Sequence, residues 1–200
     1  MDRLIGVLGG TFDPPHLGHM ILADEGRAAL GIERILWVVT ADPPHRPTKP
    51  IAPIADRLNM VQAAVAADPN FELSLADVER VGPHYSVGTL AWLSERNPGA
   101  RFAYLMGSDS LQDLPLWHTP QRFVEACSVL GVMRRPGAAL DMTELEEKLP
   151  GIGAKLAFFE APLVGISAQD IRRRVRSGAP FRYLVHPRVA DIIQSRGLYR

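Results

Sequence analysis

The sequence is short of the residues and patterns that mark secreted, nucleic-acid-binding or membrane proteins. Its one cysteine among 200 residues, Cys127, excludes an internal disulfide and argues against a cysteine-ligated zinc site. The 22 basic residues are balanced by 22 acidic ones, so the chain has no bulk attraction for nucleic acid or anionic lipid. No apolar run is long enough to span a bilayer, and Asp2 lies before a predicted strand where a signal peptide would be apolar. We therefore expect a cytoplasmic protein that binds neither nucleic acid nor membrane.

What the sequence does contain is a regular alternation of strand and helix patterns. Hydrophobic residues make up 46% of the chain and charged residues 22%, which is typical of a globular protein, and residues 1–200 suit one domain. Apolar strands that alternate with helices predict an α/β fold, a Rossmann-like, doubly wound, mainly parallel sheet with helices on both faces. Strands are predicted at residues 4–8, 34–40, 71–75, 101–106, 128–133 and 156–159, and helices at 17–30, 54–67, 86–96, 120–125, 141–149, 167–177 and 187–196.

The segment Gly9–His19 reads Gly-Gly-Thr-Phe-Asp-Pro-Pro-His-Leu-Gly-His and separates the first predicted strand from the first predicted helix. Two glycines are expected to turn the chain there and to let the backbone approach an anion closely. A helix start adds backbone N–H groups and a positive dipole end, so the arrangement favours phosphate binding. His16 and His19 are three residues apart and would share one helix face. An ordinary turn or half of a metal site is the alternative, but the His-Glu-x-x-His pattern of zinc proteases is absent.

Other polar residues follow the predicted strands in the same way. Because the carboxyl ends of parallel strands meet at one edge of a sheet, ligands bind in the crevice outside that edge. We therefore expect one cleft lined by Gly9–Thr11, Thr40, Gly107–Asp109 and Arg134. Residues 42–53 contain five prolines together with His45, Arg46 and Lys49, a composition that predicts an extended loop.

The segment Gly9–His19 resembles the signature of the bacterial nicotinate-nucleotide adenylyltransferases, members of the nucleotidylyltransferase superfamily. The resemblance covers nearly the whole chain in the expected order. It continues at Pro43–Arg46, Tyr85–Ser86, Gly107–Leu111 with Trp117, Arg134–Gly137, Ile166–Arg172 and Gly197–Tyr199.

The resemblance implies transfer of AMP from ATP to nicotinate mononucleotide, with pyrophosphate as the other product. It assigns catalysis to His16, His19 and Arg172. ATP binding falls to a second group, which comprises Gly9, Gly10, Thr11, Phe12, Ser167 and Arg134. Mg²⁺ is expected with the ATP phosphates, because the sequence offers no dedicated cage of carboxylates.

Binding of the acceptor nucleotide is assigned by resemblance to His45, Arg46, Tyr85, Ser86, Asp109 and Trp117. Backbone N–H groups near Ser86 and His118 could bind the ring carboxylate, and closure of the 42–53 loop over substrate is a hypothesis. The chain departs from the family pattern at Gln169, where a second hydroxyl residue is usual, and at His118, where tyrosine is common. These departures leave one phosphate contact and the shape of the acceptor pocket open.

Structural roles are the alternatives for several of these residues. Ser167 is expected to cap a helix as well as to bind phosphate, and Asp13 fits a turn equally well. Asp109 could cap a helix, Trp117 could be a core residue, and the three arginines at 172–174 could form a solvated basic face. At helical spacing these three cannot all point inward, and the resemblance selects Arg172. For the whole chain, the alternatives are another phosphorylated acceptor, such as nicotinamide mononucleotide or phosphopantetheine, or a non-catalytic nucleotide-binding regulator. The sequence leaves the oligomeric state open, self-association included.

Overall fold

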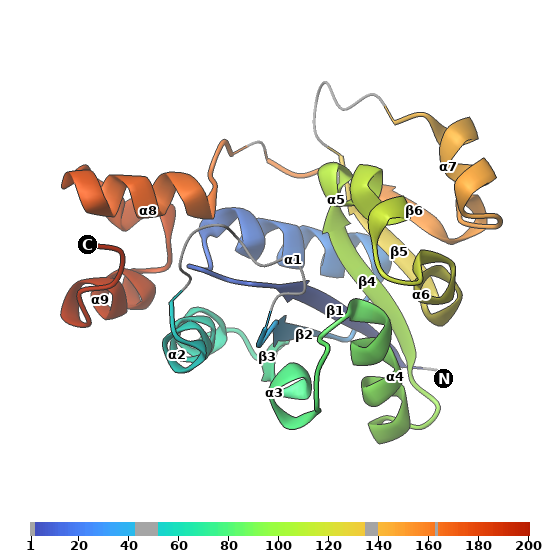
Figure 1. Cartoon of the computed structure of the whole chain (residues 1–200), viewed down its shortest axis with the longest axis horizontal. Coiled ribbons are helices and arrows are strands. Elements are labelled where there is room, and N and C mark those ends of the chain that lie inside the picture. The colour runs from blue at the N-terminus through green and yellow to red at the C-terminus, as the bar shows by residue number, and fades with distance from the viewer. Residues whose placement is uncertain (1–2, 43–51, 135–139, 163) are drawn as a thin grey trace.

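The chain folds around a six-stranded sheet in which every neighbouring pair of strands is parallel (Figure 1). The computed structural model describes residues 3–42, 52–134, 140–162 and 164–200. The strand order is β3-β2-β1-β4-β5-β6, so the direction of winding reverses between β1 and β4. This arrangement confirms the predicted doubly wound parallel sheet, and it places a ligand crevice at the reversal point. The strands are β1 (Leu4–Gly10), β2 (Arg34–Val39), β3 (Phe71–Ser74), β4 (Arg101–Gly107), β5 (Val129–Met133) and β6 (Leu156–Phe159).

Helices cover both faces of the sheet because successive strand residues alternate between two apolar clusters. Ile5 and Val7 of β1 join the cluster packed by α4 and α6, whereas Leu8 joins the cluster packed by α1 and α2. The helices are α1 (Leu17–Leu30), α2 (Ile54–Val65), α3 (Ala76–Glu79), α4 (Ser86–Arg96), α5 (Ser108–Asp113), α6 (Pro120–Ala126), α7 (Met142–Lys148), α8 (Ala168–Ser177) and α9 (Pro187–Ser195), with 3₁₀ turns at Leu114–Leu116, Gly153–Lys155 and Arg182–Leu184.

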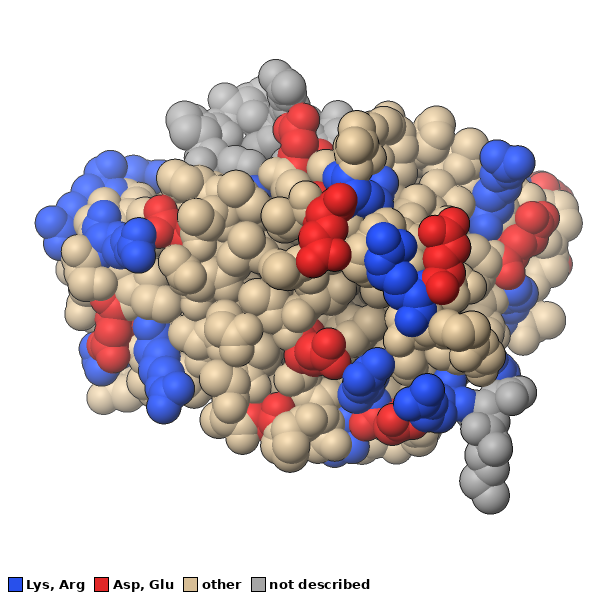
Figure 2. Space-filling view, turned by 90° about the horizontal axis from the view of Figure 1, so that it is seen from below, with Lys and Arg blue, Asp and Glu red and all other residues tan. Residues whose placement is uncertain are grey.

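A third apolar cluster joins the C-terminal helices to the rest of the molecule. Ile171 of α8 and Ile193 of α9 pack with Met60 of α2, at the end of the molecule opposite α7 (Figure 1). On the face seen in Figure 2, basic and acidic side chains are interspersed, as the balanced composition requires. Within the described ranges, no helix has the length and apolar character needed to cross a membrane.

The predicted elements are confirmed with small shifts, and two short helices were missed. The helix α3 has four residues, too few to show a periodic pattern, and α5 begins without a gap after β4. The first strand is longer than predicted, because Gly9 and Gly10 pair with Val38 and Val39 of β2. The expectation that these two glycines turn the chain is therefore wrong, and the turn lies in residues 11–16.

The start of α8 shows why its predicted capping pattern is incomplete. The Ser167 hydroxyl accepts a hydrogen bond from the Asp170 backbone N–H at 3.1 Å, so Ser167 is the N-cap. The Asp170 carboxylate does not return the bond but pairs with Arg173 and Arg174. Arg172 does not pair with Asp170 but donates to the backbone carbonyl oxygen of Asp13, between β1 and α1.

Candidate active site

The β1–α1 loop (residues 11–16) is tied to its surroundings by the buried side chain of Arg57. Arg57 is 1% exposed and lies on α2. Its guanidinium donates to the carbonyl oxygens of Thr11 at 2.9 Å, Thr40 at 2.7 Å, Ala41 at 2.9 Å and Ala52 at 3.1 Å. Burial lowers the pKa of Arg57, and the charge of Asp13 opposes that shift. One cation therefore aligns the segments that follow β1 and β2.

Phe12 gives the β1–α1 loop its bend. Its backbone φ is 48°, in the left-handed region that a side chain other than glycine rarely adopts. The Phe12 ring is buried and packs against Trp37 and His19, with centroid distances of 5.3 and 5.1 Å. Such a conformation persists only where surrounding contacts determine it, so packing of the ring helps to fix the loop.

His16 and His19 form a stacked pair at the start of α1. Their ring centroids are 3.6 Å apart, which confirms that the two side chains share one face. The backbone N–H of His16 donates to Nδ1 of His19 at 3.1 Å. An accepting Nδ1 carries no proton, so this contact assigns the proton of the His19 ring to Nε2. The loop thereby sets His19 as an Nε2–H donor.

Asp13 is a buried junction on the same loop. Its carboxylate oxygen Oδ1 accepts from the Tyr199 hydroxyl at 2.7 Å and from the Ala52 backbone N–H at 3.2 Å. Its backbone carbonyl accepts from Nη1 of Arg172 at 2.6 Å. Arg172 and Tyr199, which lie 159 and 186 positions further along the chain, thus both bind to Asp13. Asp13 is more than the turn residue that the sequence also allowed.

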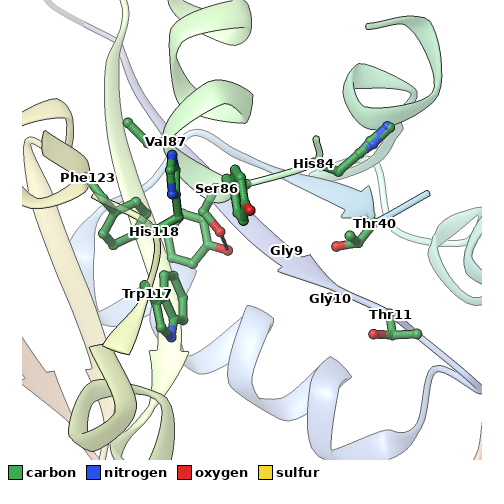
Figure 3. Close-up of a pocket in the computed structure, with 12 residues that line it drawn as sticks. Gly9, Gly10, Thr11, Thr40, His84, Ser86, Val87, Trp117, His118 and Phe123 are labelled. Carbon is green, nitrogen blue, oxygen red and sulfur yellow. Dashed lines mark hydrogen bonds between the residues drawn. The ribbon is translucent and has the colours of Figure 1, made fainter. Parts of the chain in front are cut away.

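A cavity of about 300 Å³ opens beside this loop, between the carboxyl ends of β1 and β4 (Figure 3). We call it the aromatic pocket. It lies at the point where the strand order reverses, as expected for an open α/β sheet. It is lined by Gly9, Gly10, Thr11, Thr40, His84, Tyr85, Ser86, Val87, Tyr104, Trp117, His118 and Phe123.

Ring contacts build the wall of the aromatic pocket. Tyr85 and His118 are stacked, with centroids 4.0 Å apart and planes 19° apart. Trp117 packs at an angle against Phe123 at 5.1 Å and edge-on to Tyr104 at 6.1 Å. A cavity with several aromatic faces suits a planar heterocycle, because rings stack on such faces.

Tyr104 explains why β1 carries a glycine where it passes the aromatic pocket. A Cβ atom on Gly9 would lie 2.4 Å from the Tyr104 hydroxyl, so only glycine fits without a shift of that ring. The hydroxyls of Tyr104 and Ser86 are 3.2 Å apart, within hydrogen-bond distance (Figure 3). Burial raises the pKa of Tyr104 to about 12, and the bond to Ser86 opposes part of that rise. Tyr104 is therefore a neutral hydrogen-bonding group at ordinary pH.

A buried ion pair supports the segment that carries Tyr85 and Ser86. The Asp77 carboxylate accepts from Thr89 at 2.7 Å and from Arg80 at 3.1 Å. Arg80 in turn donates to the carbonyl oxygens of Pro83 at 2.9 Å and Tyr85 at 3.2 Å. These bonds thus fix the turn that leads into α4, and that turn carries Tyr85, which lines the aromatic pocket.

The structure brings together most, but not all, of the residues predicted for the site. Gly9, Gly10, Thr11, Tyr85, Ser86 and Trp117 line the aromatic pocket, while Phe12, His16, His19 and Arg172 lie on or against the β1–α1 loop. Ser167 precedes α8 and lies near the start of α1. Its neighbour Ile166 shows this, because a Cβ atom built on Gly18 of α1 would lie 3.9 Å from the Ile166 carbonyl oxygen. His45 and Arg46 lie outside the described residues, as does the segment 43–51 of the predicted loop.

The expectation of one common cleft is wrong for four residues, none of which lines the aromatic pocket. Asp109 and Arg134 follow β4 and β5 at the expected sheet edge, but neither lines the aromatic pocket. Asp109 is exposed in the first turn of α5, because that helix begins immediately after the strand. Arg134 is also exposed, with its guanidinium 4.8 Å from the ring centroid of Phe158 and 3.9 Å from Glu160. Gly107 and Ser108 lie at the same edge and do not line the pocket either.

Sequence reasoning missed several residues that support the β1–α1 loop and the aromatic pocket. Arg57, Arg80, Tyr104 and Tyr199 were given no role in positioning the site. Arg57 did carry a signal, since it lies between the apolar positions 54, 58 and 61 of a predicted helix. A buried cation at such a position implies several acceptors nearby. The partner of Tyr199 had no comparable signal, because it lies 186 positions away.

Comparison with known proteins identifies the family to which the chain belongs. The family described as cytidylyltransferase-like matches residues 7–174. A probable nicotinate-nucleotide adenylyltransferase of Thermomicrobium roseum is 43% identical over 200 residues, which cover 100% of this chain and 92% of that protein. A probable nicotinate-nucleotide adenylyltransferase of Roseiflexus sp. is 40% identical over 98% of both chains.

Solved structures share the fold at lower identity. The nicotinic acid mononucleotide adenylyltransferase of Plasmodium falciparum, complexed with NaAD, superposes with a TM-score of 0.78 and 21% identity. The match covers 98% of this chain and 97% of that one. The same Plasmodium protein complexed with APC gives a TM-score of 0.76 at 20% identity. At these identities the likeness establishes the fold.

Proposed function

Because the chain belongs to the cytidylyltransferase-like family and, within it, to the nicotinate-nucleotide adenylyltransferases, we propose that it transfers AMP from ATP to nicotinate mononucleotide. The products are nicotinate adenine dinucleotide and pyrophosphate. The observation that carries the proposal is the adjacency of two unlike surfaces at the end of β1. Gly9, Gly10 and Thr11 line the aromatic pocket, and the loop that continues from Thr11 leads to the stacked histidines at the start of α1.

In the reaction, a 5′-phosphate oxygen of nicotinate mononucleotide attacks the α-phosphorus of ATP. A new P–O bond forms, the bond from the α-phosphorus to the bridging oxygen breaks, and pyrophosphate leaves with that electron pair. No side chain of the enzyme acts as a nucleophile, so catalysis rests on positioning and on stabilising developing charge. His16 and His19 supply imidazole N–H donors to the α- and β-phosphates, and the start of α1 adds its dipole.

Arg172 and the start of α8 bind the leaving pyrophosphate in this proposal. The Arg172 side chain is 20% exposed, and only one of its terminal nitrogens is used by Asp13. The remaining N–H groups of the guanidinium are suited to phosphate oxygens, which they bind in pairs. Ser167 contributes its hydroxyl and the backbone N–H groups of the helix start. Phe12 takes part by shaping the loop, while its ring stays buried.

Acceptor recognition is assigned to the aromatic pocket. Trp117 and Tyr85 offer ring faces to the pyridine, and Gly9 and Gly10 let the nucleotide approach the backbone. Backbone N–H groups near Ser86 and His118 are the proposed donors to the ring carboxylate, which separates the acid from its amide. His45 and Arg46 remain proposed acceptor ligands from the sequence. Asp109 and Arg134 keep their proposed nucleotide contacts only at the outer sheet edge, away from this pocket.

Mg²⁺ is proposed to enter with ATP. Within the part of the chain that the structure describes, no group of three or more His, Cys, Asp or Glu residues could hold a metal ion. Magnesium keeps several waters and binds through substrate phosphates, so a dedicated protein cage is not required. When bound, it neutralises charge on the triphosphate. We also propose that residues 1–200 act as one domain in the cytoplasm, where the buried thiol of Cys127 stays reduced.

Pyrophosphate release with ATP, Mg²⁺ and each of three acceptors tests the proposed function. The acceptors are nicotinate mononucleotide, nicotinamide mononucleotide and phosphopantetheine. We expect release to favour nicotinate mononucleotide strongly. Equal kcat/KM for the acid and the amide would refute the carboxylate contacts, and release with phosphopantetheine alone would refute the assigned acceptor. No release with any of the three, from a folded protein that binds ATP, would favour a nucleotide-binding regulator.

A further inference from the structure

Tyr199 reaches the β1–α1 loop from the far end of the chain. Its hydroxyl donates to Oδ1 of Asp13 at 2.7 Å and lies 4.0 Å from the sulfur of Met60. Its ring belongs to the apolar cluster that joins α8 and α9 to α2. Burial and the charge of Asp13 raise the pKa of this hydroxyl, so it is a permanent donor at ordinary pH. The bond therefore persists wherever the C-terminal helices are docked.

The two oxygens of the Asp13 carboxylate have different surroundings. Oδ1 accepts from both Tyr199 and the Ala52 backbone, whereas no donor among the described residues makes a hydrogen bond to Oδ2. Nη1 of Arg172 lies 3.7 Å from Oδ2 and instead donates to the Asp13 carbonyl at 2.6 Å. The carboxylate is 3% exposed, so water does not compete freely for it. The Tyr199 and Ala52 bonds together set which way the carboxylate faces, and the Tyr199 bond is the shorter of the two.

This orientation matters for Arg172. An arginine and a carboxylate prefer two parallel hydrogen bonds when their planes can align. The bonds on Oδ1 prevent that alignment, so Arg172 is tethered through one nitrogen and keeps its other donors for a ligand. Without the Tyr199 hydroxyl, only the longer Ala52 bond holds Oδ1. The carboxylate could then turn and bind Arg172 with both oxygens, which would withdraw the guanidinium from a phosphate.

We propose that Tyr199 is a positioning residue for adenylyl transfer, because its hydroxyl orients the Asp13 carboxylate and so keeps Arg172 available to the leaving pyrophosphate. The inference rests on the proposed function. It assigns to the C-terminal segment an effect on the chemical step, with no contact to either substrate. It also gives a reason why Tyr199, 186 positions from Asp13, binds to the loop that leads to the histidines.

The test is the substitution Tyr199→Phe, which removes the hydroxyl and keeps the ring. Because small displacements of a phosphate ligand cost up to about 100-fold in rate, we expect kcat to fall by about 10- to 100-fold. The KM for nicotinate mononucleotide should stay within about twofold of wild type, since the aromatic pocket is untouched. Tyr183→Phe is the matched control, because Tyr183 is 89% exposed, and it should keep the wild-type kcat. Circular dichroism of each variant establishes that it is folded at the assay temperature.

A double-mutant cycle separates positioning from simple support of the fold. If Tyr199 acts through Asp13 and Arg172, Tyr199→Phe should cost less than about twofold once Asp13→Asn or Arg172→Lys is present. The second background keeps the cycle interpretable should Asp13→Asn fail to fold. An unchanged kcat in Tyr199→Phe, or the same loss in all backgrounds, would overturn the inference. Failure of the wild-type enzyme to make nicotinate adenine dinucleotide would instead overturn the proposed function.

Discussion

The β1–α1 loop is held by side chains from distant parts of the chain, whereas the aromatic pocket is held mainly by rings that contact one another. Arg57, Arg172 and Tyr199 all hydrogen-bond to residues 11–13 of the loop. In the pocket, Tyr85 stacks on His118, and Trp117 packs against Phe123 and Tyr104. Hydrogen bonds with charge fix direction, but ring contacts tolerate small shifts. The difference fits a loop that must aim donors at phosphates and a pocket that must admit a planar ring.

Removal of Arg57 is the severest way to break this arrangement. Arg57→Met removes a buried guanidinium and leaves four carbonyl oxygens, one buried and three partly buried, without this donor. We expect a loss of unfolding free energy of about 3–5 kcal/mol, as for other broken buried networks. Urea unfolding measures it. Arg196→Met is the matched control: its ion pair with Asp56 is 3.1 Å long but the arginine side chain is 55% exposed, so about 0–1 kcal/mol should be lost. Equal losses would show that the loop is not held by Arg57.

His16→Ala tests the function of the loop without removing its supports. Loss of one preorganised donor typically lowers kcat by about 10²–10³, equivalent to about 2.7–4 kcal/mol, and we expect that range here. Single-turnover release of pyrophosphate measures the step directly. The control is His186→Asn, because His186 caps α9 and asparagine caps equally well, so turnover should persist. Full activity of His16→Ala would remove the imidazole pair from the mechanism.

The free energy of unfolding at alkaline pH should depend on the buried hydroxyl of Tyr104. Its pKa is raised to about 12 in the folded protein, so the folded state keeps the proton while the unfolded state loses it from about pH 10. Proton loss then favours unfolding, and wild type should lose about 2 kcal/mol more than Tyr104→Phe between pH 10 and 12. Urea unfolding at stepped pH gives the difference, with Tyr183→Phe as control. Parallel curves for wild type and Tyr104→Phe would contradict the burial of this hydroxyl.

Trp117→Ala should separate the pocket from the loop by kinetics. Aromatic stacking of a base is worth about 1–3 kcal/mol, so the KM for nicotinate mononucleotide should rise by about five- to a hundredfold. The kcat and the KM for ATP should change little, because the phosphate donors stay in place. Trp117→Phe keeps a ring face and should recover part of the affinity. A collapse of kcat at constant KM would mean that the two regions are not separate.

The strands and long helices could be predicted because their signals are local. Alternating apolar residues and caps such as Ser167 belong to one element each, so the order of elements was predicted correctly. The aromatic pocket also lies at the predicted edge of the sheet. The exact role of Gly9 was not predictable, since the reason for it is the Tyr104 hydroxyl on a neighbouring strand. Asp109 and Arg134 were expected in the common cleft because they follow strands, and strand order gives the edge of the sheet but not the position along it. The ties of Arg57 and Tyr199 join distant residues, which no local pattern records.

The long reach of the loop's supports has a consequence for synthesis of the chain. All six strands are complete by Phe159, whereas Arg172 and Tyr199 follow later. A chain that emerges from the ribosome N-terminus first can assemble its sheet before the last two helices arrive. The newly made sheet then carries a β1–α1 loop that lacks two of its three distant supports. Assembly of the sheet and completion of the catalytic loop can therefore be separated in time, because completion of the loop requires the C-terminal helices to dock.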